Sequence, residues 1–108
     1  MRRTITAALL AAACALAPTR GRTSWTARVT YYVEIGYTAS GQWTHDGGAA
    51  CSYDLPFGTI VRFVETGLSV VCNDRGMLGS GSPTWVDIWA PSGWPQRVLG
   101  DWAEIEVQ

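Results

Sequence analysis

Apolar and polar positions alternate along much of the chain with the two-residue period of β-strands. Clear alternation predicts strands over residues 25–33, 60–64 and 102–107. Two further runs, rich in β-branched and aromatic residues, are predicted as strands at residues 70–76 and 85–89, and residues 68–72 are predicted to return from a hairpin turn. Residues 65–67 are predicted as a hairpin turn, and residues 96–99 as one helical turn that ends at Gly100. Five or six short strands with long loops and at most one short helix indicate a small closed all-β barrel.

Length and charge narrow the possible functions. The chain has 108 residues, which is enough for one domain. Its formal net charge is −1, so it carries no basic field that could hold a nucleic-acid backbone. Nucleic acid is therefore excluded as the expected partner.

The first residues are predicted to be an export signal and not part of the fold. Arg2 and Arg3 precede an apolar stretch at residues 5–17, which is too short to span a bilayer as a mature helix. Two processing sites compete: ordinary cleavage after residue 17, or lipidation of Cys14, since Ala11-Ala12-Ala13-Cys14 resembles a bacterial lipobox. Residues 1–17 are predicted as the signal, which would instead be cleaved before Cys14 if the protein is lipidated. Residues 18–23 are predicted as a tether and 24–108 as the domain. The expected location is periplasmic, cell-envelope or secreted, with membrane anchoring only through a lipidated Cys14.

Export leaves Cys51 and Cys72 as an even pair in an oxidising compartment, where a disulfide is expected. The alternative is a pair of buried free thiols. A zinc site is disfavoured because two cysteines and one histidine at these spacings form no recognised ligand set. No metal and no organic cofactor is predicted.

Asp87 stands inside the apolar run at residues 85–89. A carboxylate in such a run must be paired, hydrogen-bonded or placed in a cleft. Its apolar neighbours, with Trp85 and Trp89 on either side, are expected to raise its pKa, which suits a general acid. The structural alternative is that Asp87 caps a turn or pairs with Arg75.

Several short segments together resemble a known family. They are Tyr31-Tyr32, Thr38-Ala39-Ser40-Gly41, Ala49-Ala50, Leu55-Pro56-Phe57-Gly58-Thr59, Asn73-Asp74-Arg75-Gly76 and Val86-Asp87-Ile88. In this order they resemble the double-psi β-barrel of the rare lipoprotein A family. They are also similar to the three-aspartate domains and, more distantly, to the N-terminal barrels of expansins and of family 45 endoglucanases. The resemblance implies a six-stranded barrel that acts on bacterial cell-wall glycan.

Some of these relatives are peptidoglycan lytic transglycosylases, and others loosen walls or only bind. The resemblance therefore implies peptidoglycan glycan strands as the partner of a monomeric protein. In lytic transglycosylation the muramic acid's own C6 hydroxyl is the nucleophile, so one protein carboxyl can serve as acid and then as base. Hydrolysis would need two carboxyls flanking the bond.

The family pattern points to particular residues. Asp87 matches the family's aspartate and is the predicted acid/base. Asp74 matches the Asp-Arg-Gly turn, although an aspartate before glycine commonly binds its own loop's amides. Asp46 resembles the acid of the family's Thr-Ala-Ser-Gly loop, although it falls one residue later than in the relatives. If Asp46 faces Asp87 across a groove, the two carboxylates would allow hydrolysis. The predicted substrate-binding residues are Tyr32, Thr38, Trp43, His45 and Arg75.

The aromatic residues divide into two groups. Trp43, in a glycine-flanked loop, is the predicted sugar-stacking platform. Trp25, Trp89 and Trp102 are predicted to be core residues because they lie in strand patterns.

One departure from the family weakens the enzymatic interpretation. The relatives have a histidine before the Leu-Pro-Phe-Gly turn, where this chain has Cys51-Ser52-Tyr53. The only histidine is His45, in the preceding loop. Two alternatives to the transglycosylase therefore stay open: an expansin-like or glycan-binding module without cleavage, and a secreted inhibitor or interaction domain.

Overall fold

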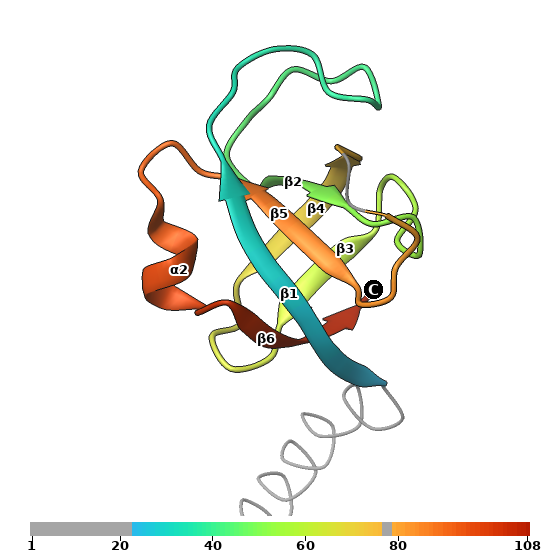
Figure 1. Cartoon of the computed structure of the whole chain (residues 1–108), viewed down its shortest axis with the longest axis vertical. Helices are drawn as coiled ribbons and strands as arrows, with labels where there is room; N and C mark the ends of the chain where they lie inside the picture. Colours follow the sequence, from blue (N-terminus) through green and yellow to red (C-terminus); the bar gives the residue numbers. More distant parts are fainter. Residues whose placement is uncertain (1–22, 77–78) are drawn as a thin grey trace, which may run out of the picture.

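A computed structural model of the protein describes residues 23–76 and 79–108. The predicted export signal at residues 1–17 and the proposed lipidation site at Cys14 lie outside this range. Six strands close into a barrel and one short helix packs beside it (Figure 1). The elements are β1 (Ser24–Tyr32), β2 (Gly48–Cys51), β3 (Ile60–Phe63), β4 (Ser69–Asp74), β5 (Trp85–Trp89), α2 (Trp94–Val98) and β6 (Trp102–Val107).

The strands follow the order β1-β5-β2-β4-β3-β6, and β6 pairs back onto β1. The pairs β1–β5 and β2–β4 are parallel, whereas the other neighbours are antiparallel. This mixed, closed arrangement confirms the predicted all-β barrel and is consistent with a double-psi topology. Every apolar strand predicted from the sequence is present, with β5 and β6 at the predicted bounds.

Strand β2 was not predicted as a strand. Its sequence, Gly-Ala-Ala-Cys, has no β-branched residue and no polar alternation, and all four residues are buried. It lies between β5 and β4 and carries an irregularity between Ala49 and Ala50. Packing between two stronger strands, and not intrinsic propensity, therefore makes this segment extended.

The core consists mainly of small and β-branched side chains from all six strands, including Val29, Val61, Val86 and Ile105, together with Phe63. Cys51 on β2 and Cys72 on β4 form a buried disulfide with a Cα–Cα distance of 5.6 Å. The predicted pairing is thus confirmed. The bond fastens two parallel strands that carry parts of the candidate site described below.

Tryptophan placement corrects part of the sequence interpretation. Trp102 is 54% exposed and is not a core residue, because it faces outward at the start of β6. Trp25 is partly buried against the core, and Trp89 is partly exposed. The helical turn begins at Trp94, two residues before the predicted start, with Gly100 in a left-handed conformation after it.

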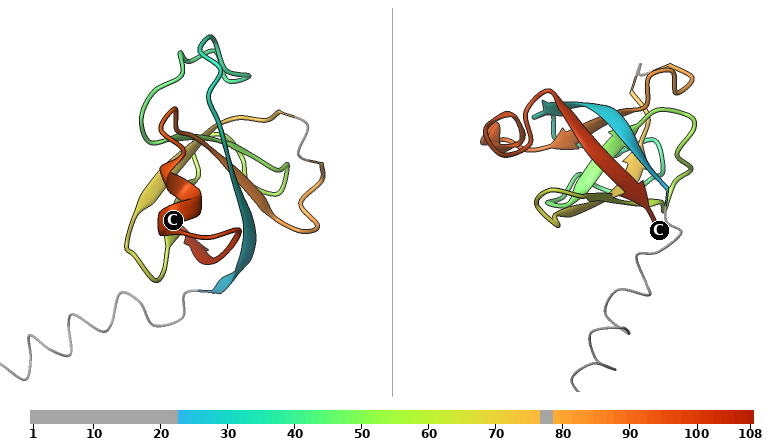
Figure 2. Two further views of the ribbon diagram at one scale, coloured as in Figure 1. Left: turned by 60° about the vertical axis from the view of Figure 1, so that its left-hand side comes forward. Right: turned by 90° about the horizontal axis from the view of Figure 1, so that it is seen from below.

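The loop between β1 and β2 extends beyond one end of the barrel, as Figures 1 and 2 show. An isolated β-bridge joins Tyr37 to Trp43 across this loop, and their rings meet edge to face at 4.9 Å. Within residues 23–76 and 79–108, no helix is both long and apolar enough to cross a membrane.

Candidate active site

Side chains from four neighbouring strands align at one level of the sheet. In the strand register, Thr30 of β1 pairs with Asp87 of β5, Asp87 pairs with Ala50 of β2, and Ala50 pairs with Asp74 of β4. On β5, Val86 and Ile88 are fully buried whereas Asp87 is partly exposed. Side chains alternate along a strand, so Asp87 and the partly exposed Thr30 and Asp74 point away from the core, while Ala50 between Asp87 and Asp74 is buried. We call this side of β6, β1, β5 and β2 the outer face.

A chain of hydrogen bonds fixes the carboxyl of Asp87. The indole Nε1–H of Trp85 donates to Thr30 Oγ1 at 2.8 Å, and Thr30 Oγ1 donates to Asp87 Oδ1 at 2.7 Å. Indole nitrogen is only a donor, so the Thr30 hydroxyl accepts that bond and has its own proton free for Asp87. Because Thr30 directs its proton at Oδ1, Oδ1 is the accepting oxygen of Asp87. When Asp87 is protonated, the geometry puts the proton on Oδ2.

The surroundings of Asp87 raise its pKa above the ordinary aspartate value. Burial is the main cause, because it disfavours the charged form, and the nearby carboxylates of Glu34 and Asp74 act in the same direction. The hydrogen bond from Thr30 opposes this shift. The direction agrees with the prediction from the apolar neighbours. An acid of this kind keeps its proton at higher pH than a solvent-exposed aspartate.

Asp74 is held by the backbone around it. Its Oδ1 accepts N–H groups from Ala39 at 2.9 Å and from Arg75 at 2.8 Å, and its Oδ2 accepts a long hydrogen bond of 3.3 Å from the Tyr32 hydroxyl. Through Ala39 it ties the β1–β2 loop to the end of β4. Asp74 therefore binds backbone amides of the loops around it, as the structural alternative predicted. It also lies near enough to Asp87 to act on it electrostatically.

Tyr32 and Glu34 complete this acidic site, which we define as Thr30, Tyr32, Glu34, Asp74 and Asp87. Burial raises the pKa of Tyr32 strongly, and the negative charges of Asp74, Asp87 and Glu34 add to the shift. Tyr32 thus stays a neutral hydrogen-bond donor. Trp89 on β5 supports the end of β1 by donating its Nε1–H to the Glu34 carbonyl at 2.8 Å.

Arg75 does not pair with Asp87. Its guanidinium donates to the Cys51 carbonyl at 3.2 Å and lies over the rings of Phe57, at 4.2 Å, and Tyr53, at 5.3 Å. These contacts pin the loop after β2 to the end of β4. The arginine alternative for Asp87 is thereby removed.

The β1–β2 loop contains three more of the predicted residues. Thr38 is buried, and its hydroxyl donates a hydrogen bond to the Gln42 carbonyl of the same loop at 2.8 Å. His45 donates from Nδ1 to the Asp46 carbonyl at 2.7 Å, and its Nε2 lies 3.3 Å from the amide nitrogen of Asn73. Asn73 is the strand neighbour of Asp74 and is itself buried. These contacts support the shape of the loop.

Trp43 and Asp46 lie at the surface of the same loop. Trp43 is 53% exposed, with Tyr37 beside it at 79% exposure. Asp46 is exposed, and the carboxylates that act electrostatically on Asp87 are those of Glu34 and Asp74. Asp46 is therefore not among the acids that raise the pKa of Asp87.

Sequence reasoning missed Thr30, Glu34 and the hydrogen-bonding role of Trp85. The outward set of β1, Arg28, Thr30 and Tyr32, could be identified from its alternation with the buried Ala27 and Val29. However, Thr30 and Asp87 are separated by 57 residues, and only the parallel β1–β5 pairing brings them together. Nothing in the local sequence of β1 signals that partner.

No family model matches the sequence. A search of curated proteins also gives no match. Among the described residues, no group of three or more histidine, cysteine, aspartate or glutamate side chains is arranged to hold a metal ion.

Proposed function

We propose that this protein is an exported enzyme that cleaves the glycan strands of bacterial peptidoglycan as a lytic transglycosylase, with Asp87 as its acid/base. The observation that carries the proposal is the environment of Asp87. Its pKa is raised by burial and by two neighbouring acids, and a hydroxyl of fixed direction holds one of its oxygens. Such a carboxyl can hold a proton and release it to a leaving oxygen.

The reaction uses the two oxygens differently. Asp87 donates the proton on Oδ2 to the glycosidic oxygen as the bond to the anomeric carbon breaks. The C6 hydroxyl of the muramic acid residue attacks that carbon, and its proton returns to Asp87. No water is consumed, and the product carries a 1,6-anhydro ring. Thr30 keeps Oδ1 occupied throughout, which presents the other oxygen to the substrate.

The raised pKa of Tyr32 gives it a supporting role in this scheme. Its one proton is donated to Asp74, so its oxygen can accept a hydrogen bond from a sugar hydroxyl or acetamido N–H without adding negative charge to the acidic site. The exposed pair Tyr37 and Trp43 offers apolar ring faces on the loop that Asp74 ties to β4.

Incubation with purified sacculi tests the proposal. Wild-type protein should release soluble fragments that end in anhydro-muramic acid, as identified by mass spectrometry. Release without anhydro ends would contradict the transglycosylase chemistry. Binding to sacculi without release would contradict enzymatic activity altogether.

One observation favours a second function, that of a glycan-binding module without cleavage. His45 contacts Asn73 and the Asp46 carbonyl, so this imidazole supports the loop. If relatives need a histidine beside the acid for turnover, this chain would bind glycan and leave it intact. In that case sacculi should co-sediment with the protein equally well for wild type and Asp87→Asn, and neither should release fragments.

Thr30→Val is expected to move the pH dependence of cleavage. The Thr30 hydrogen bond lowers the pKa of Asp87, so its removal should raise that pKa further. Activity that needs protonated Asp87 should then persist to higher pH, while the maximal rate falls because the proton is no longer confined to Oδ2. The measurement is the initial rate of fragment release across a pH series.

Thr26→Val is the matched control, because Thr26 lies on the same strand and its hydroxyl makes only a 3.4 Å contact with the exposed Glu104. Its pH profile should match wild type. A Thr30→Val profile that superimposes on wild type would show that this hydrogen bond does not tune Asp87.

Trp43→Ala is expected to weaken binding to sacculi. An exposed aromatic face contributes about 0.5–1.5 kcal/mol beyond its buried area, so the dissociation constant should rise roughly three- to tenfold. Ile35→Ala is the control, because Ile35 is an exposed apolar residue on the same loop without a ring face. Equal effects of the two substitutions in a co-sedimentation assay would argue against ring stacking by Trp43.

A further inference from the structure

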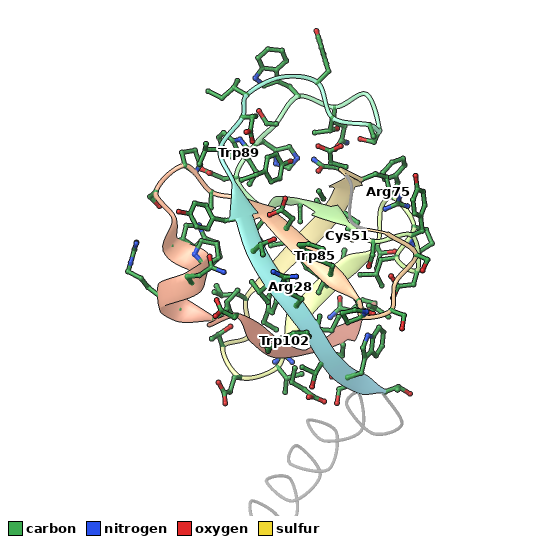
Figure 3. The ribbon with its side chains drawn as sticks, viewed as in Figure 1. Arg28, Cys51, Arg75, Trp85, Trp89 and Trp102 are labelled. Atoms are coloured by element: carbon green, nitrogen blue, oxygen red, sulfur yellow. A yellow bond between two sulfur atoms is a disulfide. The ribbon has the colours of Figure 1, made fainter. Side chains whose placement is uncertain are left out.

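The outer face carries a cation between two tryptophans, a short distance from the acidic site. Arg28 of β1 pairs in register with Trp85 of β5 on one side and with Trp102 of β6 on the other. Its guanidinium lies 4.3 Å from the centre of a Trp85 ring, which is a cation–π stack. Figure 3 shows Trp102, Arg28 and Trp85 on the same side of the barrel.

Arg28 differs from the other arginines in the described part of the chain. Arg62 pairs with Glu106 at 3.2 Å, Arg75 donates to the Cys51 carbonyl, and Arg97 donates to the Ser92 carbonyl. Within residues 23–76 and 79–108, the guanidinium of Arg28 has its ring stack but no oxygen acceptor. The side chain is exposed, so its N–H edge is open to a ligand. A stacked guanidinium is pre-oriented, which reduces the entropy lost on binding a carboxylate.

The strand spacing places Arg28 close to Asp87, because Arg28 pairs with Trp85, which lies two residues before Asp87 on β5. Trp85 and Asp87 are separated by two residues on β5, so they point the same way at about 7 Å. The Thr30 hydroxyl, which orients Asp87, receives its hydrogen bond from the same Trp85 indole that stacks on Arg28. A sugar whose carboxylate binds Arg28 would therefore lie next to the sugar on which Asp87 acts.

The charges on the outer face would orient a sugar that carries a negative substituent. Asp87, Asp74 and Glu34 form a negative region at one end, and Arg28 is a cation at the other. Glu104 of β6 also lies at the Arg28 end, where its carboxylate accepts hydrogen bonds from the Ser24 and Thr26 hydroxyls. A negatively charged substituent would be repelled by the acids and attracted to the guanidinium of Arg28. Trp102 also borders a pocket of about 110 Å³ that is lined by Phe63, Val98 and Leu99 and by the acids Glu65 and Glu104. This pocket therefore suits an uncharged substituent, and the carboxylate is left to Arg28.

We propose that Arg28, Trp85 and Trp102 form a subsite for a carboxylate-bearing sugar: Trp85 orients the guanidinium of Arg28, Arg28 holds the carboxylate, and the exposed indole of Trp102 supports the sugar ring. The inference rests on the proposed glycan substrate and adds that the site selects an acidic glycan over a neutral one. The carboxylate can come from the lactyl group of muramic acid or from an attached stem peptide. The guanidinium chemistry is the same for both sources.

Binding measurements on an Asp87→Asn background test the subsite without turnover. The probes are a tetrasaccharide of alternating N-acetylglucosamine and N-acetylmuramic acid with free lactyl carboxylates, the same tetrasaccharide with stem peptides, and the N-acetylglucosamine tetramer. With Arg28 present, at least one acidic probe should bind about tenfold more tightly than the neutral tetramer by isothermal titration calorimetry. Arg28→Gln should abolish that preference while affinity for the neutral tetramer changes little.

Arg97→Gln is the matched control, because it removes the same charge from α2, away from the outer face. It should keep the full preference. The acidic probe that is preferred identifies the source of the carboxylate. Equal binding of acidic and neutral probes, or an unchanged preference in Arg28→Gln, would overturn the proposal. The two proposals can fail separately. If wild-type protein releases nothing from sacculi but the preference for the acidic probe still depends on Arg28, the enzymatic function is contradicted and the subsite is supported.

Discussion

Asp87→Asn is expected to reduce fragment release from sacculi by about 10²–10⁴-fold, the usual contribution of a general acid/base. Asparagine has the same shape and can still accept the Thr30 hydrogen bond at Oδ1, but it has no proton to transfer. The site should therefore keep its structure and its affinity for glycan. The measurement pairs the initial rate of release with co-sedimentation on intact sacculi.

The same variant should not be less stable than wild type at neutral pH. The folded protein raises the pKa of Asp87, so over the interval between the unfolded and folded values the folded state binds more protons than the unfolded state. Stability from this group therefore falls as pH rises through that interval, and ionised Asp87 is a cost at neutral pH. Asp87→Asn removes the cost, and its advantage should vanish below the ordinary aspartate pKa of about 3.9.

Asp101→Asn, at an exposed position before β6, is the matched control for loss of one acid. It should retain wild-type activity. If Asp87→Asn releases fragments from sacculi as fast as Asp101→Asn does, Asp87 is not the acid/base. A loss of activity accompanied by a lower unfolding temperature would point to a structural role for Asp87.

Loss of the Cys51–Cys72 disulfide is expected to cause the largest drop in stability. The bond closes a loop with a sequence separation of 21 residues, which corresponds to about 3 kcal/mol in the chain-entropy model. The described domain is small, so this is a large part of its free energy of unfolding. The double variant Cys51→Ala/Cys72→Ala should unfold roughly 10–25 °C lower than wild type in thermal scans by circular dichroism.

Reduced wild-type protein separates the bond from its packing. With dithiothreitol present, both thiols remain at their buried positions but the loop constraint on the unfolded chain is gone. Reduced wild type should lose most of what the double variant loses. If reduction has no effect while the double variant is strongly destabilised, cavity formation and not the cross-link accounts for the loss.

The barrel could be predicted largely because its strands alternate in sequence. Residues 85–89 and 102–107 have the predicted bounds, since each stands between clear turn signals. Strand β2 could not be predicted as a strand, because Gly48–Cys51 is extended only through its neighbours β4 and β5. Trp102 was assigned to the core because alternation does not say which face is buried at the end of a strand.

The candidate site could be predicted only where its residues carry a local signal. Asp87 was visible because an acid in an apolar run demands an explanation. Thr30 and Glu34 carry no such signal, and their relation to Asp87 follows from the parallel pairing of β1 with β5. Thr38 and Arg75 were expected to contact substrate. In the structure, the Thr38 hydroxyl donates to the Gln42 carbonyl and the Arg75 guanidinium donates to the Cys51 carbonyl at the end of β2.

The isotopic composition of the reaction products tests the central claim most directly. Sacculi are digested in H₂¹⁸O by wild-type protein and by Asp87→Asn, and the new chain ends are analysed by mass spectrometry. The account predicts anhydro-muramic ends without ¹⁸O from the wild type and none above background from the variant. Reducing ends labelled with ¹⁸O, or equal product from both proteins, would contradict proton transfer by a single aspartate to and from the substrate.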